Sequence, residues 1–288
     1  MSELAVVLSC RPMKVLNPIR YFRRLVDYTQ RFVSRTIIPR LANFTRVAPF
    51  QFGITSLWPG TYIAYVPDRY WSARRTYNDR GGEFDCRYAQ GFIRGNELNN
   101  AGDMPRYFGL SLICDQIVKE KITGDVGELG VYKGNTAVLL AALAKKLGST
   151  AYLFDTYEGF ASEDLKGIDA NKSAHFGDTS VDGVQSLVGS RNVCYVKGHF
   201  PGSASELADN LHFCLVHIDC DLYAPFAAAL RYFYPRLVAG GFLIMHDYSN
   251  IFWDGAEKAI DEFFADKPEK LIPIPDKSGT VVIRKVAT

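Results

Sequence analysis

Two carboxylates follow an apolar run in the segment VHIDCDLYAP, residues 216–225. Asp219 comes directly after residues typical of a buried strand, and Asp221 stands two positions later. A second apolar run, FLIMHD, ends in a similar way with His246 and Asp247. Carboxylates brought to one place repel one another unless a proton or a cation neutralises them. These residues are therefore the first candidates for chemistry.

The elements that carry these residues should bring them together. The chain between Asp219 and Asp247 is long enough for a loop, one helix and a return strand, so the two apolar runs are expected to be neighbouring strands. Parallel strands end at the same edge of a sheet, and in open α/β sheets that edge binds the ligand. We therefore expect Asp219, His246 and Asp247 to converge.

A glycine-rich turn in the segment GELGVYKGNTA precedes both runs and contains Gly127, Gly130 and Gly134. Such a turn between a strand and a helix lets a ligand approach the backbone and its free N–H groups, although a structural turn without a ligand has the same appearance. Asp155 ends the following strand, where an acidic residue commonly accepts hydrogen bonds from ribose hydroxyls. The glycine spacing is not GxGxxG, which disfavours a nicotinamide dinucleotide and favours S-adenosylmethionine.

The pattern of apolar residues alternates between helical and extended periods from residue 103 onward. It predicts a mostly parallel, doubly wound α/β sheet that ends in an antiparallel hairpin at 270–285. We expect helices at 105–122, 135–148, 181–189, 225–241 and 254–266, and strands at 124–131, 150–157, 192–200, 212–221 and 242–247. With the hairpin, the sheet has seven strands.

Seven segments of the chain form a recognisable series: GDVGELGVYKGNTA, YLFDTYEGF, GDTS, VKGHFP, HIDCDLYAP, YPRLVAGGFLIMHDY and WDGAEKAIDEF. In this order they resemble the macrocin O-methyltransferase family, whose members methylate sugar hydroxyls of macrolide and aminocoumarin antibiotics. The resemblance covers roughly residues 100 to 285. It implies a class I methyltransferase with a Rossmann-like fold that binds S-adenosylmethionine and a divalent cation, Mg²⁺ or alternatively Mn²⁺ or another metal.

The resemblance also implies roles for single residues. The metal ligands fall on Asp219, His246 and Asp247, and Asp219 is also the expected general base. The family usually has an aspartate where this chain has His246, and imidazole suits Mn, Fe, Co or Zn better than magnesium. His246 acting as the base without a metal therefore stays open, and His199 is a further candidate for contact with the acceptor.

The S-adenosylmethionine site is expected around the glycine turn. For Asp178, Thr179 and Ser180, capping of the next helix is an equal alternative. Asp221 is expected to organise the start of the helix after it, with direct metal ligation as the alternative. The polar loop 158–176 is expected to be a lid, with plain surface disorder as the alternative. The residues expected to bind S-adenosylmethionine are Glu128, Gly130, Tyr132, Gly134, Asn135, Thr136, Asp155, Asp178, Thr179, Ser180 and Asp219.

Composition and charge describe the rest of the chain. The 288 residues include 48% hydrophobic and 22% charged residues, and no apolar stretch is long enough to span a bilayer. There is no signal-peptide pattern, and the six cysteines lack metal-ligand spacing, so we expect a cytoplasmic protein with reduced thiols.

Residues 1–47 carry nine Lys and Arg against two acidic residues. We expect residues 1–100 to form a basic arm followed by an irregular segment for acceptor binding, a lid or oligomerisation, and residues 101–288 to form the methyltransferase domain. A homo-oligomer is expected and nucleic acid is not, and peripheral contact of the basic arm with a membrane stays a minor alternative.

The combined prediction is an S-adenosylmethionine-dependent, divalent-metal-assisted O-methyltransferase. Its acceptor is a hydroxyl of a sugar or of a glycosylated small molecule, either a natural product or a glycan. Two alternatives stay open, namely a catechol-type O-methyltransferase acting on a small aromatic diol and a non-catalytic module that binds the cofactor or a glycan.

Overall fold

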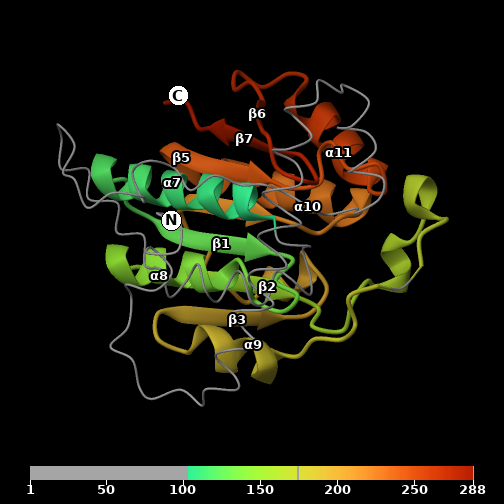
Figure 1. The fold of residues 1–288 in the computed structure, drawn as a ribbon, viewed down its shortest axis with the longest axis horizontal. Coiled ribbons are helices and arrows are strands. Elements are labelled where there is room, and N and C mark those ends of the chain that lie inside the picture. Colours follow the sequence, from blue (N-terminus) through green and yellow to red (C-terminus); the bar gives the residue numbers. More distant parts are fainter. Residues whose placement is uncertain (1–102, 174, 288) are drawn as a thin grey trace, which may run out of the picture. The chain divides into compact units, whose positions relative to one another are not determined.

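The computed structural model describes residues 103–173 and 175–287 (Figure 1). The expectations for the basic arm and the irregular segment, residues 1–100, lie outside these described residues. Within the described ranges, no helix combines the length and the apolar character needed to cross a membrane.

A seven-stranded sheet forms the centre of the described part of the chain, with the strand order β3-β2-β1-β4-β5-β7-β6. The first five strands pair in parallel, and β7 runs antiparallel to both of its neighbours. The doubly wound sheet and its antiparallel hairpin are thus confirmed. The strands are β1 (Asp125–Leu129), β2 (Ala151–Asp155), β3 (Val193–Lys197), β4 (Phe213–Ile218), β5 (Leu237–Met245), β6 (Ile272–Ile274) and β7 (Thr280–Arg284).

Helices connect the strands and cover both faces of the sheet. Figure 1 shows α7 and α8 on the face turned toward the viewer. Helix α8 ends at Gly148, which has the left-handed conformation expected of a C-terminal glycine. The helices are α7 (Met104–Glu120), α8 (Ala137–Leu147), α9 (Val181–Val188), α10 (Tyr223–Phe233) and α11 (Asp254–Phe264), with short 3₁₀ turns at Ser162–Asp164, Gly167–Asp169, Gly202–Ala204 and Tyr234–Arg236.

The predicted helix 225–241 was wrong at its C-terminal end. Helix α10 stops at Phe233, and β5 already begins at Leu237. The paired glycines do not stop a helix. They lie in an irregular stretch of β5, where the pairing with β4 jumps from Leu237 to Phe242 and Gly240 has φ +79°. The additional residues on β5 form a β-bulge. Glycine tolerates the positive φ angle in such a bulge because it lacks a Cβ.

The core packs against α10 and α11 on one face of the sheet. Val216 and Ile218 of β4 belong to this cluster together with Phe226 and Phe233 of α10. Side chains alternate along a strand, so His217 faces the opposite side, toward α7. Every residue of β4 is buried, and this strand ends directly at Asp219.

Candidate active site

The three central strands end side by side and bring the predicted residues to one edge. The backbone N–H of Asp219 donates to the Leu129 carbonyl at 2.8 Å, and that of His246 donates to the Ile218 carbonyl at 2.9 Å. Parallel pairing of β1, β4 and β5 therefore places Asp219 and His246 next to each other just beyond the sheet. The predicted convergence is confirmed.

The glycine turn lies directly against this edge. Gly130 has φ +88°, and a Cβ there would come within 1.8 Å of the Asp219 carbonyl oxygen. Only glycine fits at this position, because any side chain would collide with backbone atoms. The turn after β1 and the end of β4 thus touch through their main chains.

Asp219, His246 and Asp247 form a tight cluster. The His246 Nδ1 lies 3.0 Å from Asp219 Oδ1 and 3.1 Å from Asp247 Oδ2. One ligand atom from each of the three residues lies within 4.8 Å of the others. His246 Nε2 is buried and has no hydrogen-bond partner among the described residues. This arrangement of one nitrogen and two carboxylates has the composition of a metal-binding site.

Arg106 of α7 completes the cluster and was not predicted. Its guanidinium forms an ion pair with Asp219 Oδ2, and the side chain is 3% exposed. The same guanidinium nitrogen lies 3.2 Å from His217 Nε2, and His217 Nδ1 lies 3.0 Å from Glu128 Oε1. A buried polar chain therefore runs from Asp219 through α7 to β4 and β1.

The protonation states follow from this chain. Burial and the neighbouring Arg106 charge lower the pKa of His217 to about 3, so its imidazole is neutral. Arg106 then donates to Nε2, and Nδ1–H donates to Glu128. Burial and the nearby Asp219 charge raise the pKa of Glu128 well above its ordinary value. Its second oxygen, Oε2, is buried without a partner within the described chain.

Opposite charges dominate around His246. Burial favours the neutral form of Asp219, but Arg106 and His246 outweigh it and lower the pKa of this carboxyl well below the usual range. Burial and Arg106 oppose protonation of His246, but Asp247 and Asp219 outweigh them and raise its pKa to about 10. The Asp219 carboxylate is thus neutralised by both the Arg106 guanidinium and the His246 imidazolium, and the imidazolium also lies next to Asp247.

Asp221 has a different place from the one expected. Helix α10 has Leu222 at its N-cap and no side-chain cap, so the expectation that Asp221 organises this helix start is wrong. The Tyr223 N–H instead donates to Asp169 Oδ2 at 2.7 Å. Asp221 has φ +60° and is buried, and its carboxyl shares a hydrogen bond with Asp247. Burial and the Asp247 charge raise its pKa well above the ordinary value.

Asp155 organises the glycine turn. Its Oδ2 accepts the backbone N–H groups of Val131 at 2.7 Å and Tyr132 at 2.8 Å, and its Oδ1 accepts that of Tyr157 at 2.6 Å. These bonds hold the turn in place around a single carboxylate. The expected contact of Asp155 with ribose hydroxyls stays a prediction, and it would use the remaining lone pairs of the same two oxygens.

The other residues predicted around the turn also gather there. The Tyr132 hydroxyl donates to Asp178 Oδ1 at 2.7 Å, and Thr179 donates to the Tyr132 carbonyl. Gly134 has φ +80° and packs against α9. Asn135 and Thr136 are buried and directly precede α8.

Ser180 caps α9, because its Oγ accepts the Gly183 N–H at 3.1 Å. The capping alternative is thus confirmed for Ser180. Asp178, Thr179 and Ser180 also line a hollow of about 390 Å³, with Lys133 on its wall. A role of these residues in binding S-adenosylmethionine stays a prediction.

The polar loop after β2 joins the turn to the loop after β5. Phe160 packs edge-on against Trp253 with ring centroids 5.6 Å apart, and Phe176 packs against Tyr132 at 5.1 Å. His199, beyond β3, lies between Asp164 and Glu163 of the same loop, with contacts of 2.8 Å to each. The loop therefore bridges the two sides of the edge, and its expected role as a lid stays a prediction.

The fold and this edge define the class to which the protein belongs. The O-methyltransferase NovP has the same fold with a TM-score of 0.57 at 19% identity, over 65% of this chain and 82% of that one. The calicheamicin methyltransferase CalS11 gives a TM-score of 0.54 at 17% identity, over 77% and 98% of the two chains. The chain thus has the Rossmann-like fold of class I methyltransferases.

The sequence assigns the family. Residues 104–275 match the Macrocin-O-methyltransferase (TylF) family, and the chain belongs to it. It is 27% identical over 161 residues to the mycinamicin III 3''-O-methyltransferase of Micromonospora griseorubida, covering 50% of this chain and 63% of the relative.

A second relative comes from Streptomyces olivaceus, the 8-demethyl-8-(2,3-dimethoxy-alpha-L-rhamnosyl)-tetracenomycin-C 4'-O-methyltransferase. The identity is 25% over 169 residues, covering 51% of this chain and 61% of the relative. The chain thus spans about three fifths of the length of the curated relatives it matches.

Proposed function

We propose that this protein transfers a methyl group from S-adenosylmethionine to a hydroxyl of a sugar, either free, nucleotide-linked or attached to a small natural product, with the help of a divalent cation. The observation that carries the proposal is the meeting of Asp219, His246 and Asp247 with the Gly130 turn. The two relatives named for methylation of sugar-bearing compounds support the acceptor class.

The residues around the glycine turn fit S-adenosylmethionine. Gly130 lets the turn lie directly against the end of β4, and Glu128 Oε2 is a buried oxygen without a partner in the described part of the chain. When bound, the sulfonium supplies an already activated methyl group. The task left to the protein is to align the acceptor oxygen and to remove its proton.

The cluster beyond β4 and β5 fits a divalent cation. Asp219, His246 and Asp247 would hold it, since one ligand atom from each lies within 4.8 Å of the others and His246 Nδ1 faces both carboxylates. A bound cation lowers the pKa of a coordinated hydroxyl by several units. A donor set of one imidazole and two carboxylates suits Mn²⁺, Co²⁺ or Zn²⁺ better than Mg²⁺.

Asp219 is the proposed general base. Its Oδ1 faces His246 and its main chain touches the Gly130 turn, so it stands between the proposed cation site and the proposed methyl donor site. Asp219 would accept the proton that the acceptor hydroxyl loses when its oxygen takes the methyl group, and the donor would leave as S-adenosylhomocysteine. Trp253 and Phe160, in the two loops above the edge, would exclude water from this step.

A labelled-donor assay tests the proposal. The full chain is incubated with methyl-labelled S-adenosylmethionine and nucleotide-sugars, deoxysugar glycosides or catechols, each with Mg²⁺, Mn²⁺ or a chelator. We expect label on a sugar oxygen and loss of the product with the chelator. Label on catechols alone would show that the acceptor is an aromatic diol and not a sugar. Binding of S-adenosylmethionine without methyl transfer to any tested acceptor would indicate a non-catalytic binding module.

A further inference from the structure

Arg106 occupies one of the two carboxylate oxygens of Asp219, a residue of the proposed cation site. Its guanidinium pairs with Oδ2, while Oδ1 faces His246 Nδ1 at 3.0 Å. Both sides of this carboxylate therefore already face a cationic or hydrogen-bonding group. A divalent ion that binds Asp219 must either accept the close positive charge of Arg106 or displace it.

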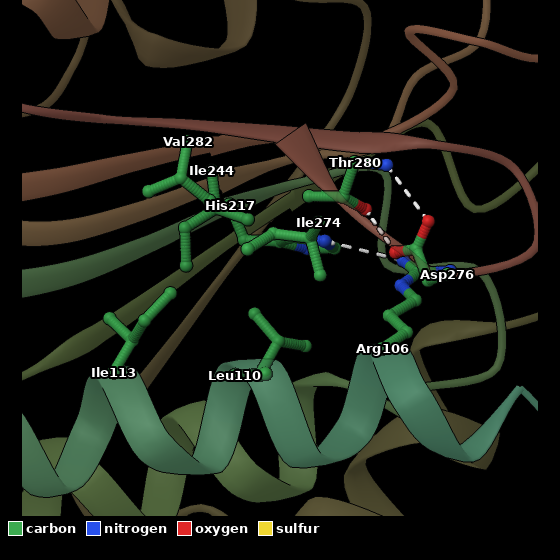
Figure 2. Close-up of a pocket in the computed structure, with 10 residues that line it drawn as sticks. Arg106, Leu110, Ile113, His217, Ile244, Ile274, Asp276, Thr280 and Val282 are labelled. Atoms are coloured by element: carbon green, nitrogen blue, oxygen red, sulfur yellow. Dashed lines mark hydrogen bonds between the residues drawn. The ribbon is translucent and has the colours of Figure 1, made fainter. Parts of the chain in front are cut away.

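The structure offers the displaced guanidinium another carboxylate. A small cavity of about 10 Å³ lies between α7 and the sheet, lined by Arg106, Leu110, His217 and Asp276 among others. Figure 2 shows Arg106 at the end of this cavity where Asp276 lies. Asp276 accepts hydrogen bonds from the Thr280 N–H at 2.8 Å and from its hydroxyl, so the carboxylate is fixed in position.

We propose that Arg106 is a positioning residue that competes with the divalent cation for Asp219 and so sets the affinity of the site. In the cation-free protein it holds Asp219. When a cation binds, the guanidinium shifts away from Asp219 toward Asp276, which lies at the same end of the cavity (Figure 2). This inference rests on the cation site of the proposed function.

Direct binding of Mn²⁺ tests the inference without the methyl-transfer reaction. Titrations of the full chain are followed by the electron paramagnetic resonance of free Mn²⁺. They compare the wild type with Arg106→Met, Arg106→Gln, Arg106→Lys and the control Arg284→Met. Arg284 is a matched control because it pairs with Glu120 at the surface. Gln keeps an amide donor for Asp219 and His217 but carries no charge, so it separates loss of charge from loss of folding.

We expect Arg106→Gln and Arg106→Met to bind Mn²⁺ about tenfold or more tightly than the wild type, because a unit positive charge next to the ion is removed. Arg106→Lys and Arg284→Met should stay near the wild-type affinity. A residue that only supports the fold would weaken binding when replaced. Equal or weaker Mn²⁺ binding by folded Arg106→Gln would overturn the inference, and so would absence of binding in every variant.

The outcomes separate this inference from the proposed function. Mn²⁺ affinities are measured without donor or acceptor, whereas the labelled-donor assay uses the wild type alone. If Arg106→Gln binds Mn²⁺ more tightly but the wild type transfers no methyl group, the role of Arg106 is supported and the proposed reaction is contradicted. If the wild type transfers the methyl group but Arg106→Gln has an unchanged Mn²⁺ affinity, the proposed reaction is supported and the competition between Arg106 and the cation is contradicted.

Discussion

The two halves of the sheet edge are held together by different kinds of interaction. On the β1–β2 side, one carboxylate, Asp155, accepts three backbone N–H groups of the glycine turn and the loop beside it. On the β4–β5 side, the carboxylate of Asp219 is held by the side chains of Arg106 and His246.

This difference separates a fixed site from an exchangeable one. Backbone N–H groups cannot leave a turn without unfolding it, so the donor side is shaped before a ligand arrives. Side-chain charges can be displaced by another cation without unfolding the chain, because the incoming cation keeps the buried carboxylate paired. The comparison predicts that changes on the β4–β5 side affect the reaction, whereas changes on the β1–β2 side affect donor binding and stability.

The largest effect is expected from Asp219→Asn. Loss of the proposed base should lower methyl transfer by about a hundredfold to ten-thousandfold, because general base catalysis contributes a factor of this size. The dissociation constant of S-adenosylmethionine should change little. Rates and calorimetric binding are compared with Asp209→Asn, a control at an exposed position. Unimpaired transfer by Asp219→Asn would remove the base assignment.

Removal of divalent cations should have the next largest effect. A chelator is expected to lower the rate by about a hundredfold, since a bound cation contributes several kcal/mol to such a step. Mn²⁺ should restore the rate better than Mg²⁺, and His246→Asp should reverse this order, because it makes the donor set all oxygen. A control is His212→Asp, which changes an exposed histidine. The prediction fails if the chelated enzyme keeps its full rate.

Asp155→Ala tests the fixed half. Loss of the carboxylate that holds Val131 and Tyr132 should weaken S-adenosylmethionine binding about tenfold and lower the free energy of unfolding by about 1–3 kcal/mol. The rate at saturating donor should change less than the affinity. Calorimetry and urea denaturation measure the two effects. A lost rate with unchanged donor affinity would contradict the division of the edge into two halves.

Glu128→Gln should change how stability depends on pH. The pKa of Glu128 in the folded protein is raised above the ordinary 4.5, so its stabilising contribution is complete below that pH and is lost as the pH rises to the folded value. The loss amounts to at most about 1.4 kcal/mol per pH unit. Urea denaturation at a series of pH values should show a flatter dependence for Glu128→Gln than for the exposed control Glu206→Gln. Parallel curves for the two variants would contradict the raised pKa.

Ser180→Ala should give the smallest effect. Removal of the α9 cap should cost about 1 kcal/mol in the free energy of unfolding. If Ser180 only caps the helix, the affinity for S-adenosylmethionine stays unchanged. A weakened affinity with unchanged stability would instead place Ser180 in the donor site.

Local patterns in the sequence predicted much of this architecture. Apolar runs and glycine punctuation located every strand, to within a few residues except at the start of β5, and the parallel order followed from their alternation with helices. The meeting of Asp219 with His246 and Asp247 was predictable because strand ends share one edge. The end of α10 was not, since an apolar run with two glycines fits both a helix stop and a bulged strand.

Long-range pairing was the part that the sequence did not predict. Arg106 lies 113 positions from Asp219, and an arginine in an apolar helix gives no sign of its partner. From its position in the sequence, Asp221 was expected at a helix start. Its pairing with Asp247 was not predictable, because both residues have a left-handed backbone conformation that the sequence pattern does not reveal. Such contacts arise from tertiary structure and leave no periodic pattern.

A crystal structure of the full chain with S-adenosylhomocysteine and Mn²⁺, with anomalous data collected for manganese, tests the central claim most directly. The account predicts the sulfur of the nucleoside beside the Gly130 turn and the manganese peak on Asp219, His246 and Asp247. A nucleoside bound away from that turn, or a manganese peak elsewhere in the protein, would contradict it.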